Sequence, residues 1–411
     1  MSLKTNVTFI TGHLAKERHA LLYELALDLS ENGATVTVIT GFPSRRIDDE
    51  TRNYYLNNPV EKINENLVIK RVGSKKGEGN GLLSRMVKYL FLTKRLYKEA
   101  KRTKTDAYYI YSSPPFLGYL GKKLSKIAPT LYNAQDIFPD SLITIKNLSE
   151  KNLMIKYFRK KEKQVYKYNS KIVTISETMK KNIIDQGCDS QKIEVIYNWA
   201  DTSKLYPVKK EENRLYETLN IDKKKFIVSY AGDIGLFQCW DCILEVAKRM
   251  KEINKEIVFE FIGDGSYLDK MKKYIEKENI TNIHLHPMQK QDVLAEVYSI
   301  GDVELAPIAT GLTKYALPSK ICNIMAVGKP ILALLDKESE FYEIINDNNM
   351  GIAIEPNNVE LLLKTIIELF EMKKDLCKMG ENAVNFINNN CYRQLQTKKY
   401  YNVLYNIAQK R

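Results

Sequence analysis

The stretch LPSKICNIMAVGKPILALL, residues 317–335, decides much of the fold of this chain. A Pro-Ser pair precedes an apolar pattern of helical spacing, and a Gly-Lys-Pro turn leads from it into an apolar strand at 331–335. The pattern predicts a helix whose first turn carries Ser319, Lys320 and Asn323. Backbone N–H groups and the helix dipole favour an anion at such an N-terminus, and Lys320 adds a full charge.

Strands and helices alternate on both sides of this stretch. In the first half, apolar segments predict strands at 7–11, 35–40, 107–111, 130–132, 172–175 and 193–197. In the second half they predict strands at 226–231, 257–262, 283–285, 303–306, 331–334 and 351–354. This rhythm indicates an α/β protein with doubly wound parallel sheets.

The length of 411 residues favours two domains, because single cores stop growing well below that size. Residues 201–225 are charged and lack a strong apolar period, which predicts a linker. We therefore expect a first domain at 1–200 and a second at 226–385. One or two helices should follow, ending with a C-terminal helix at 386–411.

The positive charge is concentrated in the first half of the chain. Residues 1–200 hold 34 Lys and Arg against 20 Asp and Glu, whereas residues 201–411 hold 29 against 30. A basic and apolar helix is expected over 82–98, and such a helix can lie on an anionic membrane. The competing interpretation is an ordinary helix packed on the sheet under a solvated, lysine-rich surface. The basic residues form no recognised nucleic-acid-binding module, so nucleic acid is not an expected partner.

The six cysteines are scattered, which is typical of reduced thiols in a cytoplasmic protein. A lone Cys239-x-x-Cys242 pair has only His284 and His286 as conceivable partners, and it is a weak signal for a zinc site. No stretch is apolar enough to span a membrane, and the first residues show no signal-peptide pattern.

Glycine-rich turns follow two strands of the second domain. Gly232 and Gly235 lie after the first of them, in the segment AGDIGLFQ at 231–238, where backbone can approach a pyrophosphate at a helix N-terminus. Gly263 and Gly265 follow the next strand. Plain tight turns are the alternative interpretation at both places.

A polar segment, YNAQDIFPD at 132–140, ends a strand of the first domain. A carboxylate at the carboxyl end of a parallel strand can orient or deprotonate a hydroxyl group, and Asp136 is the best candidate for that role. The alternative is a structural aspartate that caps the helix after Pro139.

These segments together resemble family-4 glycosyltransferases of bacterial polysaccharide synthesis, the retaining group 1 enzymes. The run 318–330 is similar to their P-S-K-x-x-E-x-M-A-x-G-x-P segment, and 133–139 is similar to their N-x-Q-D-[IL]-[FW]-P segment. The resemblance implies the GT-B fold: two Rossmann-like domains facing a central cleft, with the last helix crossing back onto the first domain.

The resemblance also implies a set of donor-binding residues. Those positions are Gly232, Asp233, Gly235, Gln238, Gly263, Gly265, Pro287, Met288, Ser319, Lys320 and Asn323. Two departures matter: the family usually has Glu where this chain has Asn323, and Asn where it has Asp233. On the acceptor side the implied residues are Gly12, His13, Gln135, Asp136 and Phe138, although the usual Gly-Gly turn is reduced to Gly12.

The implied activity is transfer of a sugar from a nucleotide-sugar, expected to be a UDP-sugar, to a polyprenyl-diphosphate-linked saccharide for capsule, exopolysaccharide or O-antigen. Lys320 and Asp136 are the expected catalytic residues, no metal cofactor is expected, and the enzyme is expected on the inner face of the cytoplasmic membrane. Two alternatives share the fold: a UDP-sugar 2-epimerase, and a catalytically inactive partner of another transferase.

Overall fold

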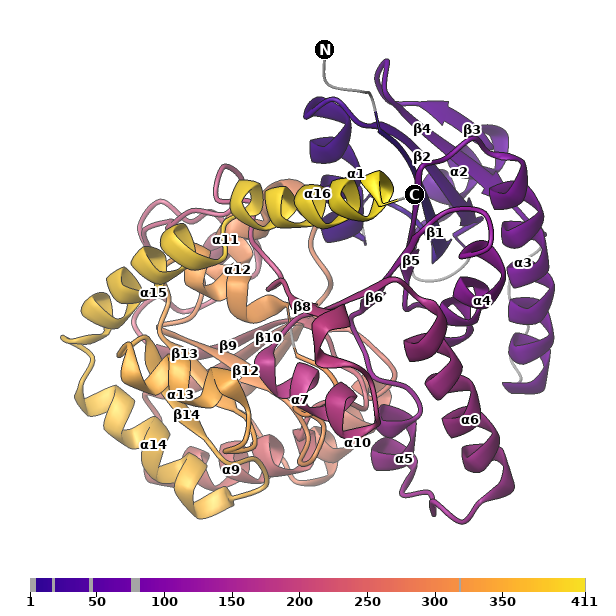
Figure 1. Cartoon of the computed structure of the whole chain (residues 1–411). Coiled ribbons are helices and arrows are strands. Elements are labelled where there is room, and N and C mark those ends of the chain that lie inside the picture. Colours follow the sequence, from indigo (N-terminus) through magenta and orange to yellow (C-terminus); the bar gives the residue numbers. More distant parts are fainter. Residues whose placement is uncertain (1–4, 17–18, 44–46, 75–81, 318, 411) are drawn as a thin grey trace. The chain divides into compact units, whose positions relative to one another are not determined.

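The computed structural model describes residues 5–16, 19–43, 47–74, 82–317 and 319–410, and it contains two compact α/β units (Figure 1). The first unit comprises Met1–Ile143, Leu148–Tyr197 and Gln394–Arg411. The second comprises Thr144–Asn147 and Asn198–Arg393. Each is built on its own, mainly parallel sheet, which confirms the predicted fold class.

The first unit has an eight-stranded sheet in the order β3-β4-β2-β1-β5-β6-β7-β8. Its strands are β1 (Asn6–His13), β2 (Thr35–Gly41), β3 (Val60–Lys62), β4 (Leu67–Val72), β5 (Ala107–Tyr111), β6 (Thr130–Ala134), β7 (Lys171–Thr174) and β8 (Ile193–Val195). All neighbours pair in parallel except β3, which is antiparallel to β4. The central strands are buried almost throughout, as expected for strands covered on both faces.

The helices of the first unit lie between its strands, apart from the last one, which follows all strands in the chain. They are α1 (Ala20–Glu31), α2 (Asp49–Asn57), α3 (Leu82–Arg102), α4 (Gly121–Leu124), α5 (Asp140–Lys146), α6 (Leu153–Tyr168), α7 (Glu177–Asp185) and α16 (Arg393–Gln409). Short 3₁₀ turns lie at η1 (Pro115–Leu120) and η2 (Ser190–Lys192). Although α16 comes last in the chain, it packs with this unit: Tyr400 lies edge-on to Tyr109 of β5, with ring centres 6.0 Å apart.

The second unit has a six-stranded, fully parallel sheet in the order β11-β10-β9-β12-β13-β14. Its strands are β9 (Phe226–Asp233), β10 (Ile257–Asp264), β11 (Ile283–His286), β12 (Val303–Pro307), β13 (Ile331–Leu334) and β14 (Gly351–Ile354). Its helices are α8 (Leu215–Thr218), α9 (Trp240–Ile253), α10 (Leu268–Lys277), α11 (Leu294–Tyr298), α12 (Lys320–Ala326), α13 (Glu340–Asp347), α14 (Val359–Glu371) and α15 (Leu376–Asn390), with a 3₁₀ turn at η3 (Gln291–Val293).

Along the strands of the second unit, successive side chains point to opposite faces of the sheet. Phe226, Val228 and Tyr230 of β9 point into an apolar cluster shared with α9, α10 and α14. The residues between them face the other side of the sheet, where Ser229 is buried opposite Glu304 of β12 in the strand register. This alternation is the two-residue period of a strand.

Residues 201–225, for which the sequence predicts a linker, pack on the second unit. Tyr216 is buried and donates a hydrogen bond to the carbonyl oxygen of Ile300, and the Asn213 amide donates to the carbonyl of Glu296 at 2.7 Å. The apolar positions here are too few and too widely spaced to give a periodic signal, yet Leu215, Tyr216 and Ile221 are enough to anchor the segment.

Candidate functional site

Three side chains hydrogen-bond the backbone of the loop between β9 and α9. The Tyr230 hydroxyl donates to the carbonyl oxygen of Asp233 at 2.6 Å, and the Trp240 indole donates to the carbonyl of Gly235 at 3.0 Å. The amide of Gly235 donates to the Gln238 side chain at 3.0 Å. Gln238, predicted to contact the donor, therefore holds the loop itself.

Lys320, the first residue of α12, reaches this loop. Its ammonium donates to the carbonyl oxygen of Ala231 at 3.0 Å and lies 3.2 Å from the centre of the Tyr230 ring. Gly232 has φ +133°, and a Cβ there would lie 3.3 Å from the Lys320 nitrogen. A glycine thus leaves room for the ammonium directly beside the turn. The structure brings together Lys320 and the Gly232 loop, which sequence reasoning placed in one site.

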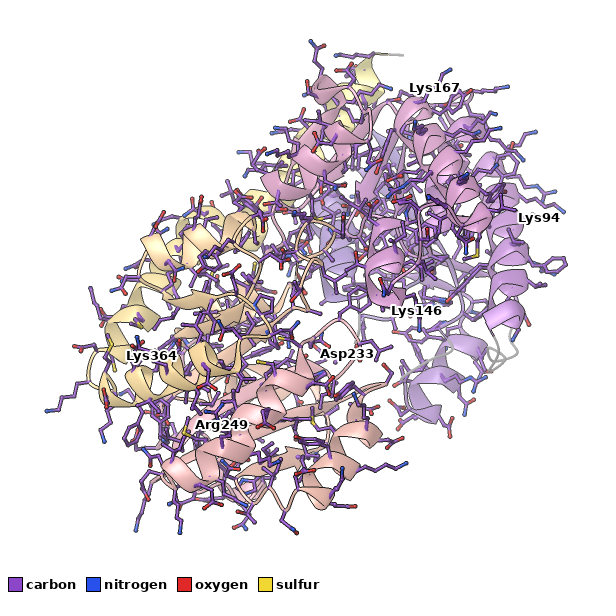
Figure 2. The ribbon with its side chains drawn as sticks, turned by 90° about the horizontal axis from the view of Figure 1, so that it is seen from below. Lys94, Lys146, Lys167, Asp233, Arg249 and Lys364 are labelled. Carbon is purple, nitrogen blue, oxygen red and sulfur yellow. The ribbon has the colours of Figure 1, made fainter. Side chains whose placement is uncertain are left out.

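Burial lowers the pKa of Lys320 to about 7, and the negative charges of Glu304 and Asp233 partly offset that shift. A lysine with a pKa this near neutrality sits in a functional-site environment more often than on an ordinary surface. Asp233, which replaces the usual Asn of the resembling family, belongs to this site as a carboxylate that favours the charged form of Lys320. Figure 2 shows Asp233 at the end of β9, where the strand leads into this loop.

Gly263 and Gly265 have a packing role. A Cβ on Gly263 would lie 2.0 Å from the carbonyl oxygen of Gly232, and one on Gly265 would lie 2.1 Å from that of Ile234. No side chain fits at either position. The two glycines let the end of β10 press against the Gly232 loop, so they shape the site through its backbone.

Pro287 and Met288 follow β11 at the same carboxyl edge of the sheet, and both are exposed. The two histidines of β11 bind a carboxylate: His284 and His286 hydrogen-bond Glu260 at 2.7 and 2.6 Å. They do not join Cys239 and Cys242, whose buried thiols have pKa values raised to about 12 and 11. These thiols are protonated near neutral pH and poor nucleophiles.

Ser319 and Asn323 flank Lys320 in sequence. Ser319 occupies the position before α12, is exposed, and makes no capping hydrogen bond with its side chain. Asn323 is partly buried and hydrogen-bonds the hydroxyl of Tyr298, the last residue of α11. The three polar side chains expected at one helix end are therefore in three different environments. Pro318 lies outside the described residues.

Glu304 of β12 is a charged residue of this site that sequence reasoning missed. Its carboxylate is fully buried, accepts a hydrogen bond from the Ser229 hydroxyl and lies 3.4 Å from the amide of Gly301. Its second oxygen has no hydrogen-bond partner in the part of the chain that the structure describes. Burial raises its pKa to about 7, against the opposing charges of Lys329 and Lys320. The available signal was a single acidic residue inside the apolar segment VELAP, 303–307.

Asp136 follows β6 in the first unit and lines a small cavity of about 10 Å³. One of its carboxylate oxygens is buried without a hydrogen-bond partner among the described residues, and the Ser141 hydroxyl hydrogen-bonds the carboxylate. Burial raises the Asp136 pKa to about 6; Ser141 opposes this shift and Asp140 adds to it. The cavity also brings Asp136 near Glu162 of α6, whose pKa burial raises to about 7.

The remaining acceptor-side candidates are largely engaged in packing. A Cβ on Gly12 would lie 2.2 Å from the ring of Pro114, and the Phe138 ring lies 4.9 Å from that of Phe158. The amide of Gln135 donates to Ser112, and its side chain donates to Asn133 at 3.3 Å. His13 ends β1, with its ring centre 6.2 Å from that of Tyr89.

The described residues hold neither a metal-binding cluster nor a helix that could span a membrane. They contain no group of three or more His, Cys, Asp or Glu side chains placed to hold a metal ion. Within the same residues, no helix is both long enough and apolar enough to cross a membrane.

Two family models match this chain and together span most of it. Residues 19–204 match Glycosyltransferase Family 4, and residues 211–386 match Glycosyl transferases group 1. The chain belongs to the group 1, family 4 glycosyltransferases. This confirms the resemblance found in the run 318–330 and supports the prediction of an enzyme. The first match covers the unit with Asp136, and the second covers the unit with Lys320.

Relatives and solved structures agree with this family. The chain is 27% identical over 271 residues to the probable glycosyltransferase WbjE of Pseudomonas aeruginosa, covering 64% of this chain and 65% of that one. It is 25% identical over 205 residues to WcaI of Escherichia coli K12, a putative colanic acid biosynthesis glycosyl transferase, covering 49% and 50%. The chain thus spans between half and two thirds of these curated relatives.

Among solved structures, HepE of Anabaena in complex with UDP-glucose superimposes with a TM-score of 0.73 at 13% identity, covering 98% of this chain and all of that one. At this identity the match shows the fold alone. It establishes the GT-B architecture of two α/β units for this glycosyltransferase.

Proposed function

We propose that this protein transfers a sugar from a nucleotide-sugar, specifically a UDP-sugar, to a lipid-linked saccharide, with retention of configuration. The observation that carries the proposal is Lys320, whose ammonium rests against the glycine turn after β9. A cation beside a glycine turn at the carboxyl edge of a parallel sheet suits a diphosphate. The UDP-glucose bound to HepE supports the choice of base.

The proposed chemistry depends on charge at the leaving group. Breaking the bond between sugar and diphosphate leaves negative charge on the diphosphate, and Lys320 beside the Gly232–Gly235 turn would stabilise it. Such preorganised electrostatic stabilisation is usually the largest single contribution to catalysis. In this scheme Lys320 supplies the positive charge, and we propose no metal cofactor.

Asp136 is proposed to act on the acceptor. Its raised pKa, its position after β6 and its unpartnered oxygen suit a carboxylate that orients or deprotonates a hydroxyl group. The contact with Ser141 at the start of α5 also supports the competing structural role, because it ties Asp136 to that helix. Replacing Asp136 by Asn distinguishes the two roles, because it lowers the rate of transfer only if Asp136 acts on the acceptor.

The acceptor is proposed to be a polyprenyl-diphosphate saccharide at the inner face of the cytoplasmic membrane. Two helices of the first unit expose apolar side chains among basic ones. On α3, Leu90 and Phe91 are 55% and 61% exposed beside Lys94 and Arg95; on α6, Leu153 is 82% exposed. Figure 2 shows Lys94 and Lys167 projecting from these helices. The polysaccharide role of WcaI supports an acceptor of this class.

An inactive, glycosyltransferase-like partner protein is the second candidate. Asn323 replaces the usual Glu of the family and is engaged with Tyr298, which removes a charge from the expected ribose contact. A UDP-sugar 2-epimerase of the same fold is distinguished by its reaction.

One experiment separates these functions: incubation with a panel of nucleotide-sugars, with and without an extract of polyprenyl-linked saccharides. Release of nucleoside diphosphate only in the presence of the lipid supports the transferase. Isomerisation of the sugar without lipid would establish the epimerase instead. Nucleotide binding with neither reaction would identify the inactive partner, and absence of any nucleotide binding would overturn both enzyme functions.

A further inference from the structure

The second unit has a cavity at the edge of its sheet opposite to the edge where Lys320 lies. It has a volume of about 410 Å³ and is lined entirely by residues of the second unit. It opens where strands begin: Phe226 is the first residue of β9, while Asp302 and Pro330 directly precede β12 and β13. With a rise of about 3.3 Å per residue, the eight residues of β9 separate this edge from the Gly232 turn by roughly 23 Å.

The cavity is strongly basic. Five lysines line it against only two carboxylates, Glu256 and Asp302. The lysines are Lys210, Lys224, Lys225, Lys329 and Lys373. An ordinary lysine-rich surface spreads its charges into solvent, whereas here they converge on one hollow of a size typical for small-molecule sites.

Two of the five lysines are already paired. Lys210 lies 3.2 Å from the carboxylate of Asp302, and Lys225 lies 2.9 Å from that of Glu256. These pairs use both carboxylates of the lining. Lys224, Lys329 and Lys373 make no ion pair within the described part of the chain, so three positive charges remain for a ligand.

Lys329 is the most constrained of these three. Gly328 adopts φ +65°, which turns the chain from α12 into β13, and a Cβ there would lie 3.1 Å from Val384 of α15. Lys329 follows this turn and is partly buried, and burial lowers its pKa despite the charges of Asp302 and Glu304. A partly buried lysine without a paired carboxylate is costly unless an anion arrives.

The wall of the cavity also has an apolar side. Phe226, Pro330, Phe370 and Leu376 line it, and the Lys373 ammonium lies 5.1 Å from the centre of the Phe370 ring. Lysine ammonium groups bind phosphate well as compact point charges. The apolar wall can pack against a ring of the same ligand. We propose that this cavity is a second anion-binding site, separate from the donor site, for a small molecule carrying two or more phosphate groups.

Cys377 provides a local probe of this site. It lines the cavity and is exposed, whereas the other five cysteines are buried. Its alkylation by iodoacetamide can be followed by peptide mass spectrometry in the full chain, with inorganic pyrophosphate and UDP as separate probes. We expect pyrophosphate to slow alkylation by about tenfold at about ten times its Kd, because only the unoccupied fraction reacts.

Three variants make the result specific. Lys320→Ala removes the donor-site cation, and protection of Cys377 should persist in it. The Lys329→Gln/Lys373→Gln double variant should lose the protection, whereas Lys272→Gln on α10, which is exposed and outside the cavity, should keep it. Circular dichroism checks that each variant is folded, and the alkylation rate with anion is always compared with the rate without it.

Two outcomes would overturn the proposal: an alkylation rate that pyrophosphate and UDP leave unchanged, or protection that disappears in Lys320→Ala. Protection by pyrophosphate alone assigns the site to a free polyphosphate, and stronger protection by UDP assigns it to a nucleotide. Both of those results support the proposal. Neither depends on glycosyl transfer, so failure of the transferase assay leaves this test intact.

Discussion

Lys320 holds its ammonium 3.2 Å from the centre of the Tyr230 ring while donating to the carbonyl oxygen of Ala231. A cation over an aromatic face is attracted by the ring's negative quadrupole. Both partners are neutral, so neither compensates the charge as a carboxylate would. Lys320 therefore lies next to the Gly232 turn with two weak interaction partners, the Tyr230 ring and the Ala231 carbonyl. A bound diphosphate would replace them as the partner of the ammonium.

Replacing Lys320 by Ala should weaken UDP binding by about 10- to 100-fold, because hydrogen bonds to charged groups contribute about 1.5–3 kcal/mol each. Isothermal titration calorimetry measures the change. Lys337→Ala, at a lysine paired with Glu355 at 3.2 Å, serves as the matched control and should bind UDP normally. Equal affinity of Lys320→Ala and the parent protein would remove Lys320 from the site.

The affinity for UDP should fall as the pH rises above 7. Burial lowers the Lys320 pKa to about 7, so the free protein loses this proton above that pH. A bound diphosphate favours the ammonium, so binding must restore the proton, and the affinity drops by up to about tenfold per pH unit until the pKa of the complex is reached. Titrations from pH 7 to 9, in buffers of different ionisation enthalpy, would reveal the proton uptake. A slope that persists in Lys320→Ala would assign it to another group, of which Glu304 is the nearest candidate.

Gly263→Ala should destabilise the second unit by more than about 3 kcal/mol, since the new Cβ would lie 2.0 Å from backbone that cannot move without breaking the Gly232 turn. Gly33→Ala is the comparison: Gly33 has φ +93° but nothing within 4 Å of an added Cβ, so only strain of about 1 kcal/mol is expected. Thermal denaturation of both variants measures the difference. Similar melting temperatures would show that the β10 end relaxes around a methyl group.

The strands could be predicted well from the sequence, for a physical reason. Strands buried on both faces have continuous apolar runs, and the predicted bounds at 107–111, 331–334 and 351–354 agree with β5, β13 and β14. The edge strand β3 and its neighbour β4 were missed because they carry charge. Arg71 of β4 is buried only because it pairs with Glu61 and lies 4.1 Å from the centre of the Tyr55 ring, and neither partner can be identified from local pattern.

The site residues that belong to a sequence motif could be predicted. Those that reach the site only through packing of the fold could not. The Pro-Ser-Lys run and the glycine turn identified Lys320 and Gly232. The partners that determine the state of Lys320, namely Tyr230 and Glu304, belong to strands whose pattern shows only burial. The role of Asn323 was also hidden, because its partner Tyr298 lies on another helix.

Asp136→Asn should lower the rate of transfer by about 100-fold or more while leaving UDP binding unchanged, since a positioned base contributes about 10²–10⁴. Because the Asp136 pKa is raised to about 6, the carboxylate form is lost below that pH, and the parent enzyme should lose activity as the pH falls through 6. The pH–rate profile and single-turnover kinetics test both statements. Ser141→Ala removes the side-chain contact of Asp136 and reports on the structural role. A transfer rate unaffected by Asp136→Asn would leave Asp136 with that structural role alone.

Membrane binding should depend on the exposed apolar and basic side chains of α3. Lys94→Gln/Lys98→Gln should weaken binding to vesicles containing anionic lipid by about 30-fold, because each basic residue near such a surface contributes about 1 kcal/mol. Phe91→Ser should weaken it further and independently of salt, since Phe91 is 61% exposed and would insert its ring. Ile253→Ser, at a 52% exposed residue that ends α9 in the other unit, is the matched control. Vesicle co-sedimentation at two salt concentrations separates the two contributions. If the α3 variants and the control sediment alike, the membrane surface must be assigned to another part of the chain.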